Sequence, residues 1–202
     1  MLDRVALQLL RPTLDAAARG LARAGLHADH VTLIGFGIGM AGAVSIAFEQ
    51  FVPGLLLILT SRLCDGIDGA LARLTVPTDR GGFLDITLDF LFYASIPLAF
   101  AVARPGANAL AAAVLLAAFI GTATTFLAFA TLAAQRGLKS AANPSKGIYY
   151  LGGLTEGTET LICFALMCLW PAQFALFAYG FAALCGLTVA MRLWAGWRTF
   201  SA

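Results

Sequence analysis

The residues of this sequence most suited to chemistry are carboxylates that lie within long apolar segments. The 202-residue chain has eleven Asp and Glu residues. Six of them fall within apolar segments, namely Asp65, Asp68, Asp85, Asp89, Glu156 and Glu159. A carboxylate near the centre of a bilayer costs about 2.5 to 3.5 kcal/mol on insertion scales, whereas a leucine returns about 0.6 kcal/mol at best. Such residues need partners or water, and they indicate a functional site.

The spacing of the four aspartates predicts a metal site. Asp65 and Asp68 are three residues apart, and Asp85 and Asp89 are four apart, so each pair shares one helix face. Hard cations such as Mg²⁺ and Mn²⁺ prefer oxygen ligands, and two of them would balance four carboxylates. Two ions roughly 3.5 to 4 Å apart stabilise both oxygens of an in-line phosphoryl displacement. We therefore expect two divalent cations, Mg²⁺ or Mn²⁺, and diphosphate chemistry.

Small residues beside the aspartates leave room for a ligand. Gly66 and Gly69 adjoin the first pair of aspartates. Small residues at fourfold spacing are also typical of close helix packing in membranes, which is how we interpret Gly35 and Gly39 in the first apolar segment. Because Gly66 and Gly69 adjoin carboxylates, we expect these two glycines to border the site.

The elements that must position these residues are membrane helices. The sequence is 60% hydrophobic and 12% charged, with a mean hydropathy of +0.85, an excess of apolar residues over the needs of a soluble core. Six apolar segments are long enough to cross a bilayer. They are 31–48, 51–74, 82–102, 107–134, 148–170 and 172–194. The sequence predicts an all-α integral membrane protein with six transmembrane helices over residues 27–202.

Residues 1–26 alternate charged and apolar side chains, a pattern typical of an interfacial amphipathic helix. Pro12 is expected to kink or split this helix. An ordinary surface helix is the alternative interpretation. The four cysteines lie within the apolar segments without zinc-site spacing, and we interpret them as small apolar side chains.

Basic residues predict the orientation. With six spans and the N-terminus inside, twelve of the thirteen Lys and Arg residues lie inside or at the inner ends of spans, and Arg104 lies outside. Both termini are then cytoplasmic, with the aspartates near the cytoplasmic face of the inner membrane. The net charge of +2 fits membrane lipids, and no basic cluster indicates nucleic-acid binding.

The stretch DGIDGALARLTVPTDRGGFLDITLD, residues 65–89, fits the pattern DxxDGxxAR followed by GxxxDxxxD. It resembles the signature of the CDP-alcohol phosphatidyltransferase family (class I). The resemblance implies that the four aspartates bind the metals and that Asp89 is also the catalytic base that takes the acceptor's proton. It further implies a nucleotide-binding border made by Gly69, Ala72, Arg73 and Gly81.

The activity implied by this resemblance is transfer of the phosphoryl-alcohol group of a CDP-alcohol, such as CDP-diacylglycerol, to an acceptor alcohol, with release of CMP, in phospholipid biosynthesis. The resemblance also favours a homodimer. Two positions depart from the usual pattern. The spacer between Arg73 and Gly81 has seven residues where eight are more common, and Asp29 and His30 replace Pro and Asn before the first span. Asp29 can still act as a helix N-cap, and His27 and His30 are interpreted as interfacial residues, not ligands.

The fifth apolar segment predicts the acceptor side. Glu156 and Glu159 are three residues apart with threonines and glycines around them, and Lys146 lies at the membrane edge. We expect these three residues to bind the acceptor. In the alternative interpretation the glutamates bind neighbouring helices or Arg62, and the lysine follows from topology alone.

Two other functions remain open at this stage. An intramembrane prenyltransferase also uses aspartate-bound Mg²⁺ and a diphosphate substrate, but it would have more spans and a different aspartate spacing. An ion-coupled transporter also uses buried carboxylates, but it would show inverted repeats and broken helices.

Overall fold

The computed structural model describes residues 2–138 and 153–201, and these residues form helices joined by short connections. In chain order the helices are α1 (Leu2–Arg23), α2 (Ala28–Ala47), α3 (Phe51–Leu74), α4 (Asp79–Ala103), α5 (Pro105–Gln135), α6 (Gly157–Leu169), the 3₁₀ helix η1 (Pro171–Gln173) and α7 (Phe174–Phe200). No strand occurs in this part of the chain. The predicted all-α fold is confirmed.

Within the described residues, four helices are long and apolar enough to cross a bilayer. They are α2, α4, α5 and the run 171–200 formed by η1 and α7. The helix α3 matches the predicted span 51–74 but carries Arg62 at its middle and Asp65, Asp68 and Arg73 in its C-terminal half. The helix α6 is apolar but only 13 residues long. The six-span arrangement as a whole therefore stays a prediction.

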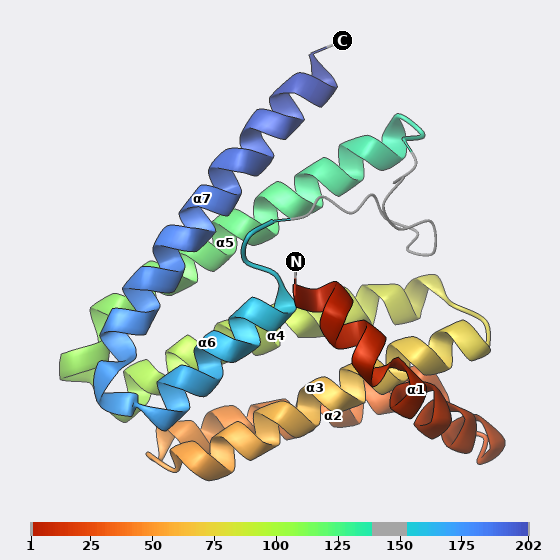
Figure 1. The fold of residues 1–202 in the computed structure, drawn as a ribbon, viewed down its shortest axis with the longest axis horizontal. Coiled ribbons are helices and arrows are strands. Elements are labelled where there is room, and N and C mark those ends of the chain that lie inside the picture. Colours follow the sequence, from red (N-terminus) through yellow and green to blue (C-terminus); the bar gives the residue numbers. More distant parts are fainter. Residues whose placement is uncertain (1, 139–152, 202) are drawn as a thin grey trace.

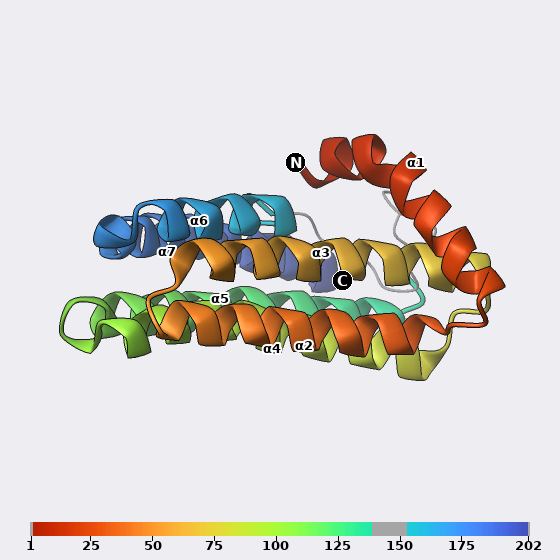
Figure 2. The same cartoon turned by 90° about the horizontal axis from the view of Figure 1, so that it is seen from below.

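The helix α2 contacts both α3 and α4, while α5 and α7 lie side by side (Figures 1 and 2). Gly35 and Gly39 allow this close packing: a Cβ atom at Gly35 would lie 2.7 Å from Cys64 Cβ, and one at Gly39 would lie 2.7 Å from Phe92. Such distances are below any normal carbon contact, so only glycine fits. The packing interpretation of these two glycines is confirmed.

The main core lies among α2, α3, α4, α5, α6 and α7. Its centre is aromatic, because Phe100 stacks on Phe174 with ring centroids 4.6 Å apart and on Phe51 at 5.5 Å. At the same end of the bundle, Arg104 Nε donates to Glu49 Oε2 at 3.2 Å. These contacts hold together the α2–α3 connection, the end of α4 and the start of α7.

The helix α1 continues through Pro12 as one helix, so the chain is not split there. Leu14 and Ala18 are buried in a small cluster with Ala70 and Leu71 of α3. Leu14 occupies the space beside Gly66, where a Cβ atom would lie 3.0 Å from its Cδ1. Gly66 thus accommodates α1 instead of bordering the site, which corrects that expectation. The interfacial position of α1 stays a prediction.

Candidate functional site

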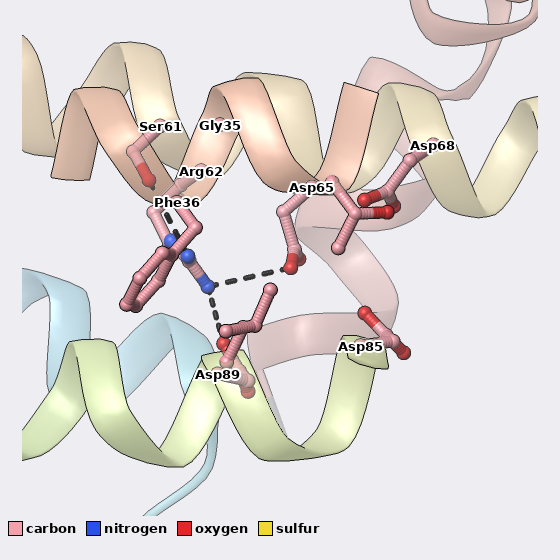
Figure 3. Close-up of a pocket in the computed structure, with 10 residues that line it drawn as sticks. Gly35, Phe36, Ser61, Arg62, Asp65, Asp68, Asp85 and Asp89 are labelled. Carbon is pink, nitrogen blue, oxygen red and sulfur yellow. Dashed lines mark hydrogen bonds and ion pairs between the residues drawn. The ribbon is translucent and has the colours of Figure 1, made fainter. Parts of the chain in front are cut away.

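The four aspartates come from two helices that α2 holds together. Asp65 and Asp68 lie in the C-terminal half of α3, and Asp85 and Asp89 lie in the N-terminal half of α4. Figure 3 shows the two pairs facing each other across one pocket. The three- and four-residue spacings therefore put the two members of each pair on one helix face, as the sequence predicts.

Three of the four carboxylates converge. Oxygen atoms of Asp65, Asp68 and Asp85 all lie within 4.8 Å of one another. Asp68 is 4% exposed, and its Oδ2 has no hydrogen-bond partner among the described residues. A buried, unpaired carboxylate oxygen is costly unless a cation or a donor satisfies it. An all-oxygen set with such an atom fits a hard divalent cation such as Mg²⁺ or Mn²⁺.

Asp89 is held separately by Arg62. Arg62 Nη1 donates to Asp89 Oδ1 and lies 3.5 Å from Asp65 Oδ1. The Arg62 guanidinium lies over the Phe92 ring, 4.0 Å from its centroid. The structure thus groups three of the expected ligands and places the fourth in an arginine–carboxylate pair. Arg62 was considered from the sequence only as a charge within the span and as a partner for the glutamates.

A cavity of about 230 Å³ adjoins the acidic group. Its lining shares Thr32, Asp68 and Asp85 with the acidic pocket. Three of the expected nucleotide residues also line it, namely Gly69, Ala72 and Gly81. The fourth, Arg73, does not line the cavity, but its Nη1 lies 3.5 Å from where a Cβ atom of Gly69 would be.

The rim of this cavity contains residues that the sequence did not single out as site residues. Thr78 is the N-cap of α4 and accepts a hydrogen bond from Gly81 N at 3.0 Å. Arg80 Nε donates to Asp29 Oδ2 at 2.8 Å. His27, not Asp29, is the N-cap of α2, so the expected capping role of Asp29 is wrong. Asp29 lies in the first turn, where it fixes Arg80 instead.

Two of the expected acceptor residues, Glu156 and Glu159, lie at the start of α6 and not on the two helices that carry the aspartates. Lys146 lies outside the described residues. Glu156 is the N-cap of α6 and Glu159 its third residue, and the two form a capping box in which Glu156 N donates to Glu159 Oε2 at 3.3 Å. Among the described residues, the helix predicted over 148–170 begins only at Gly157, because this capping box starts it. The glutamates are therefore at a helix start, not in mid-span.

Glu156 lines a third cavity of about 420 Å³ between α4, α5, α6 and α7. The apolar part of its wall includes Phe90, Tyr93, Phe119 and Phe126, and the polar part includes Thr155, Glu156, Thr160 and Arg192. Arg192 is 9% exposed and its Nη1 donates to the Thr122 carbonyl oxygen at 2.9 Å. In the sequence, Arg192 served only to predict which side of the membrane the helix ends face. A basic residue within an apolar segment also indicates a functional site, and this signal could have identified Arg192.

The third cavity and the acidic pocket are neighbours. Arg62 lines the acidic pocket, and its Cζ lies 5.6 Å from the centroid of the Tyr93 ring, which lines the third cavity. Asp89 precedes Phe90 of the same wall in the sequence. The site therefore has a carboxylate centre with a cavity on each side, one near the α3–α4 connection and one among the later helices.

Comparisons with known proteins agree with this arrangement. The chain is 50% identical over 199 residues to the inner membrane protein YnjF of Escherichia coli, covering 98% of this chain and 97% of that protein. It is 39% identical over 84 residues to archaetidylinositol phosphate synthase of Methanothermobacter thermautotrophicus, a match that covers 41% of this chain and 42% of that enzyme.

Solved structures share the fold. The phosphatidylinositol phosphate synthase PgsA1 of Mycobacterium tuberculosis, crystallised with CDP-DAG, aligns with a TM-score of 0.66 and 24% identity, covering 91% of this chain and 93% of that one. The same protein has been crystallised with manganese and citrate, and that structure aligns with a TM-score of 0.64. The family model for CDP-alcohol phosphatidyltransferase matches residues 26–197. The chain therefore belongs to the CDP-alcohol phosphatidyltransferase family.

Proposed function

We propose that this chain transfers the phosphoryl-alcohol group of a CDP-alcohol, such as CDP-diacylglycerol, to an acceptor alcohol and releases CMP. The observation that carries the proposal is the convergence of Asp65, Asp68 and Asp85 beside a cavity lined by Gly69 and Gly81. PgsA1 binds CDP-DAG with a related fold, which supports the same donor class here. Family membership favours this activity over a prenyltransferase or a transporter.

The aspartates supply the metal site in this proposal. Asp65, Asp68 and Asp85 would hold the first of two divalent cations, Mg²⁺ or Mn²⁺, and the manganese complex of PgsA1 supports that choice. When bound, such ions polarise phosphoryl oxygens and offset the charge that develops during displacement. Small side chains at Gly69, Ala72 and Gly81 leave the cavity wall open for the nucleotide, and Arg73 supplies a permanent positive charge beside it.

Asp89 is the proposed general base. The acceptor hydroxyl oxygen forms a bond to the phosphorus that carries the donor alcohol, the bond from this phosphorus to the bridging oxygen breaks, and CMP leaves with that electron pair. The hydroxyl proton passes to Asp89. Arg62 binds Oδ1 of this carboxylate, which leaves its second oxygen to accept the proton.

The acceptor is proposed to bind in the third cavity. Thr155 and Thr160 offer hydroxyls, Glu156 offers a carboxylate, and Arg192 offers a buried cation, a set that suits a hydroxyl-rich acceptor. The relatives named as inositol phosphate synthases support a polyol phosphate as the first acceptor to test. Lys146 and Glu159 remain proposed acceptor residues on sequence grounds.

Six membrane crossings are proposed from the way that helix ends meet. The helices α2 and α4 both start at the aspartate end, and their other ends meet through Glu49 and Arg104. If both cross the membrane, α3 must return across it between them. Similarly, the Phe100–Phe174 stack places the start of α7 at the Arg104 end, so the chain must cross back between α5 and α7, and α6 is proposed as part of that crossing. This proposed topology has both termini and the site on the cytoplasmic side, with α1 as an interfacial helix. A homodimer also remains a proposal.

The test is CMP release by the full chain purified in detergent. With Mn²⁺, CDP-diacylglycerol and a panel of inositol phosphate, glycerol phosphate, serine and choline, we expect one acceptor to stimulate release. Asp85→Asn and Asp89→Asn should each lower the rate at least about 100-fold. Glu49→Gln, at the opposite end of the bundle, is the control. Release that persists in both aspartate variants, or no release with any acceptor, would contradict the proposal.

A further inference from the structure

Arg62 is a cation built into the acidic site. Its side chain is 13% exposed and comes from the same helix as Asp65, one turn earlier. The guanidinium binds Asp89 Oδ1 and lies 3.5 Å from Asp65 Oδ1 (Figure 3). It also lies over the buried ring of Phe92. It therefore sits between the two helices that carry the carboxylates.

The position of the guanidinium is closely defined. Phe92 is fully buried below it, and Arg62 Nη2 lies 3.4 Å from the buried Ser61 Oγ. Arg62 Nε has no hydrogen-bond partner among the described residues. The hydrogen bond from Nη1 to Asp89 Oδ1 is therefore the main polar contact of the guanidinium. A guanidinium stays protonated at any physiological pH, so this positive charge is permanent.

This contact explains why the four aspartates are not equivalent. Oxygens of Asp65, Asp68 and Asp85 lie within 4.8 Å of one another, and Asp89 does not join that group. Its Oδ1 is already bound to Arg62. A divalent cation that used the same oxygen would meet a fixed like charge at short range, and such repulsion is strong in a partly buried site.

We propose that Arg62 is a positioning residue that holds Asp89 apart from the other three aspartates, so that the resting site binds one divalent cation tightly and a second one weakly. The inference rests on the proposed function only in that these carboxylates bind divalent cations. The guanidinium acts as an internal counter-ion for Asp89 and orients the proposed base before substrate arrives.

The experiment counts Mn²⁺ ions on the full chain without substrate, from the electron paramagnetic resonance signal of free Mn²⁺ during titration. The wild-type chain should bind one ion tightly and a second at least about tenfold more weakly. In Arg62→Gln the second ion should bind at least about tenfold more tightly than in the wild type. Arg62→Lys, which keeps the charge, should retain the weak second site.

Arg104→Gln is the control, because it removes the same charge at the opposite end of the bundle, away from the acidic pocket. It should change either affinity by less than about threefold, since distant exposed charges are screened. An unchanged second site in Arg62→Gln, or an equal change in Arg104→Gln, would overturn the inference.

A second pair of variants keeps the test decisive if Arg62→Gln does not fold. Asp85→Asn should weaken the first ion at least about 100-fold, whereas Asp89→Asn should weaken it by less than about tenfold. Equal losses in the two variants would refute the special position of Asp89. If the wild-type chain binds no Mn²⁺ at all, the proposed metal site itself is wrong and the inference is refuted with it.

Discussion

At the residue scale, the buried carboxylates differ in what already satisfies them. Asp89 has an arginine, whereas Asp68 is 4% exposed with one oxygen that lacks a hydrogen-bond partner among the described residues. An unsatisfied buried polar atom costs about 1 to 3 kcal/mol. The buried carboxylate of Asp68 therefore lowers the stability of the metal-free fold, as expected for a residue that binds a metal ion.

Replacing Asp68 by Asn should separate stability from metal binding. Without metal, Asp68→Asn should melt at or above the wild-type temperature, because the buried negative charge is gone. Mn²⁺ at about 100 times its dissociation constant should stabilise the wild type by about 2.7 kcal/mol but not the variant. Thermal unfolding in detergent, with and without chelator, measures both. An equal rise with Mn²⁺ in the two proteins would remove Asp68 from the metal site.

The two glutamates of α6 allow a matched comparison of binding and capping. Glu156 lines the third cavity, and Glu159 does not. Glu159→Gln keeps a capping-box side chain, so we expect little effect on stability and a smaller effect on the acceptor KM than Glu156→Gln has. Glu156→Gln should raise the apparent KM for the acceptor about 10-fold or more and leave that for CDP-diacylglycerol within about twofold. Steady-state kinetics with each substrate varied in turn test this, and equal acceptor KM values in the two variants would point to a capping role alone.

At the element scale, α2 is the support on which the site depends. It contacts both α3 and α4, and its glycines let Cys64, Ser61 and Phe92 approach its backbone. Asp65 N itself lies 3.9 Å from where a Cβ atom of Gly35 would be. The distance between the two aspartate pairs is therefore set by a helix that contributes no carboxylate to the acidic pocket.

A single methyl group on α2 tests that dependence. In Gly35→Ala the new Cβ would lie 2.7 Å from Cys64 Cβ, so α3 must shift. We expect a loss of about 1 to 3 kcal/mol in stability, together with weaker Mn²⁺ binding. Gly37→Ala, where no atom lies within 4 Å of the new Cβ, is the control on the same helix. If both variants melt and bind Mn²⁺ alike, close packing at Gly35 does not set the site.

Local patterns in the sequence predicted much of this site, and contacts between distant segments account for the rest. The span 51–74 and the aspartate spacings follow from helical periodicity, which is local. The pairing of Arg62 with Asp89 joins residues 27 positions apart and depends on how α3 and α4 rotate about α2. The start of α6 was predicted too early, because the apolar run obscured the capping box of Glu156 and Glu159. The third cavity needs four helices, and no single segment indicates it.

At the scale of the whole molecule, the two ends of the bundle differ in chemistry. The end near the α3–α4 connection carries the aspartates, the nucleotide-side cavity and the Arg80–Asp29 pair. The opposite end carries the exposed Glu49–Arg104 pair, whose hydrogen bond lowers the pKa of Glu49 and raises that of Arg104. Basic residues are scarce at the Glu49–Arg104 end, and the positive-inside rule predicts such scarcity on the side of the membrane that faces away from the cytoplasm.

Cysteine labelling from one side of the membrane tests this orientation. Gly106→Cys places a thiol at the Arg104 end, where no atom lies within 4 Å of the new Cβ, and Val76→Cys places one at the α3–α4 connection, where Val76 is 79% exposed. In intact cells a membrane-impermeant maleimide should label Gly106→Cys only, and Val76→Cys should react only after the membrane is opened. The parent chain is the background control, because it measures any labelling of the partly exposed Cys64, while Cys163, Cys168 and Cys185 are buried. Val76 also lines the nucleotide-side cavity, so CDP-diacylglycerol with Mn²⁺ should slow labelling of Val76→Cys and not of Gly106→Cys. The reverse pattern in intact cells would place the site on the outer face and contradict a donor supplied from the cytoplasm.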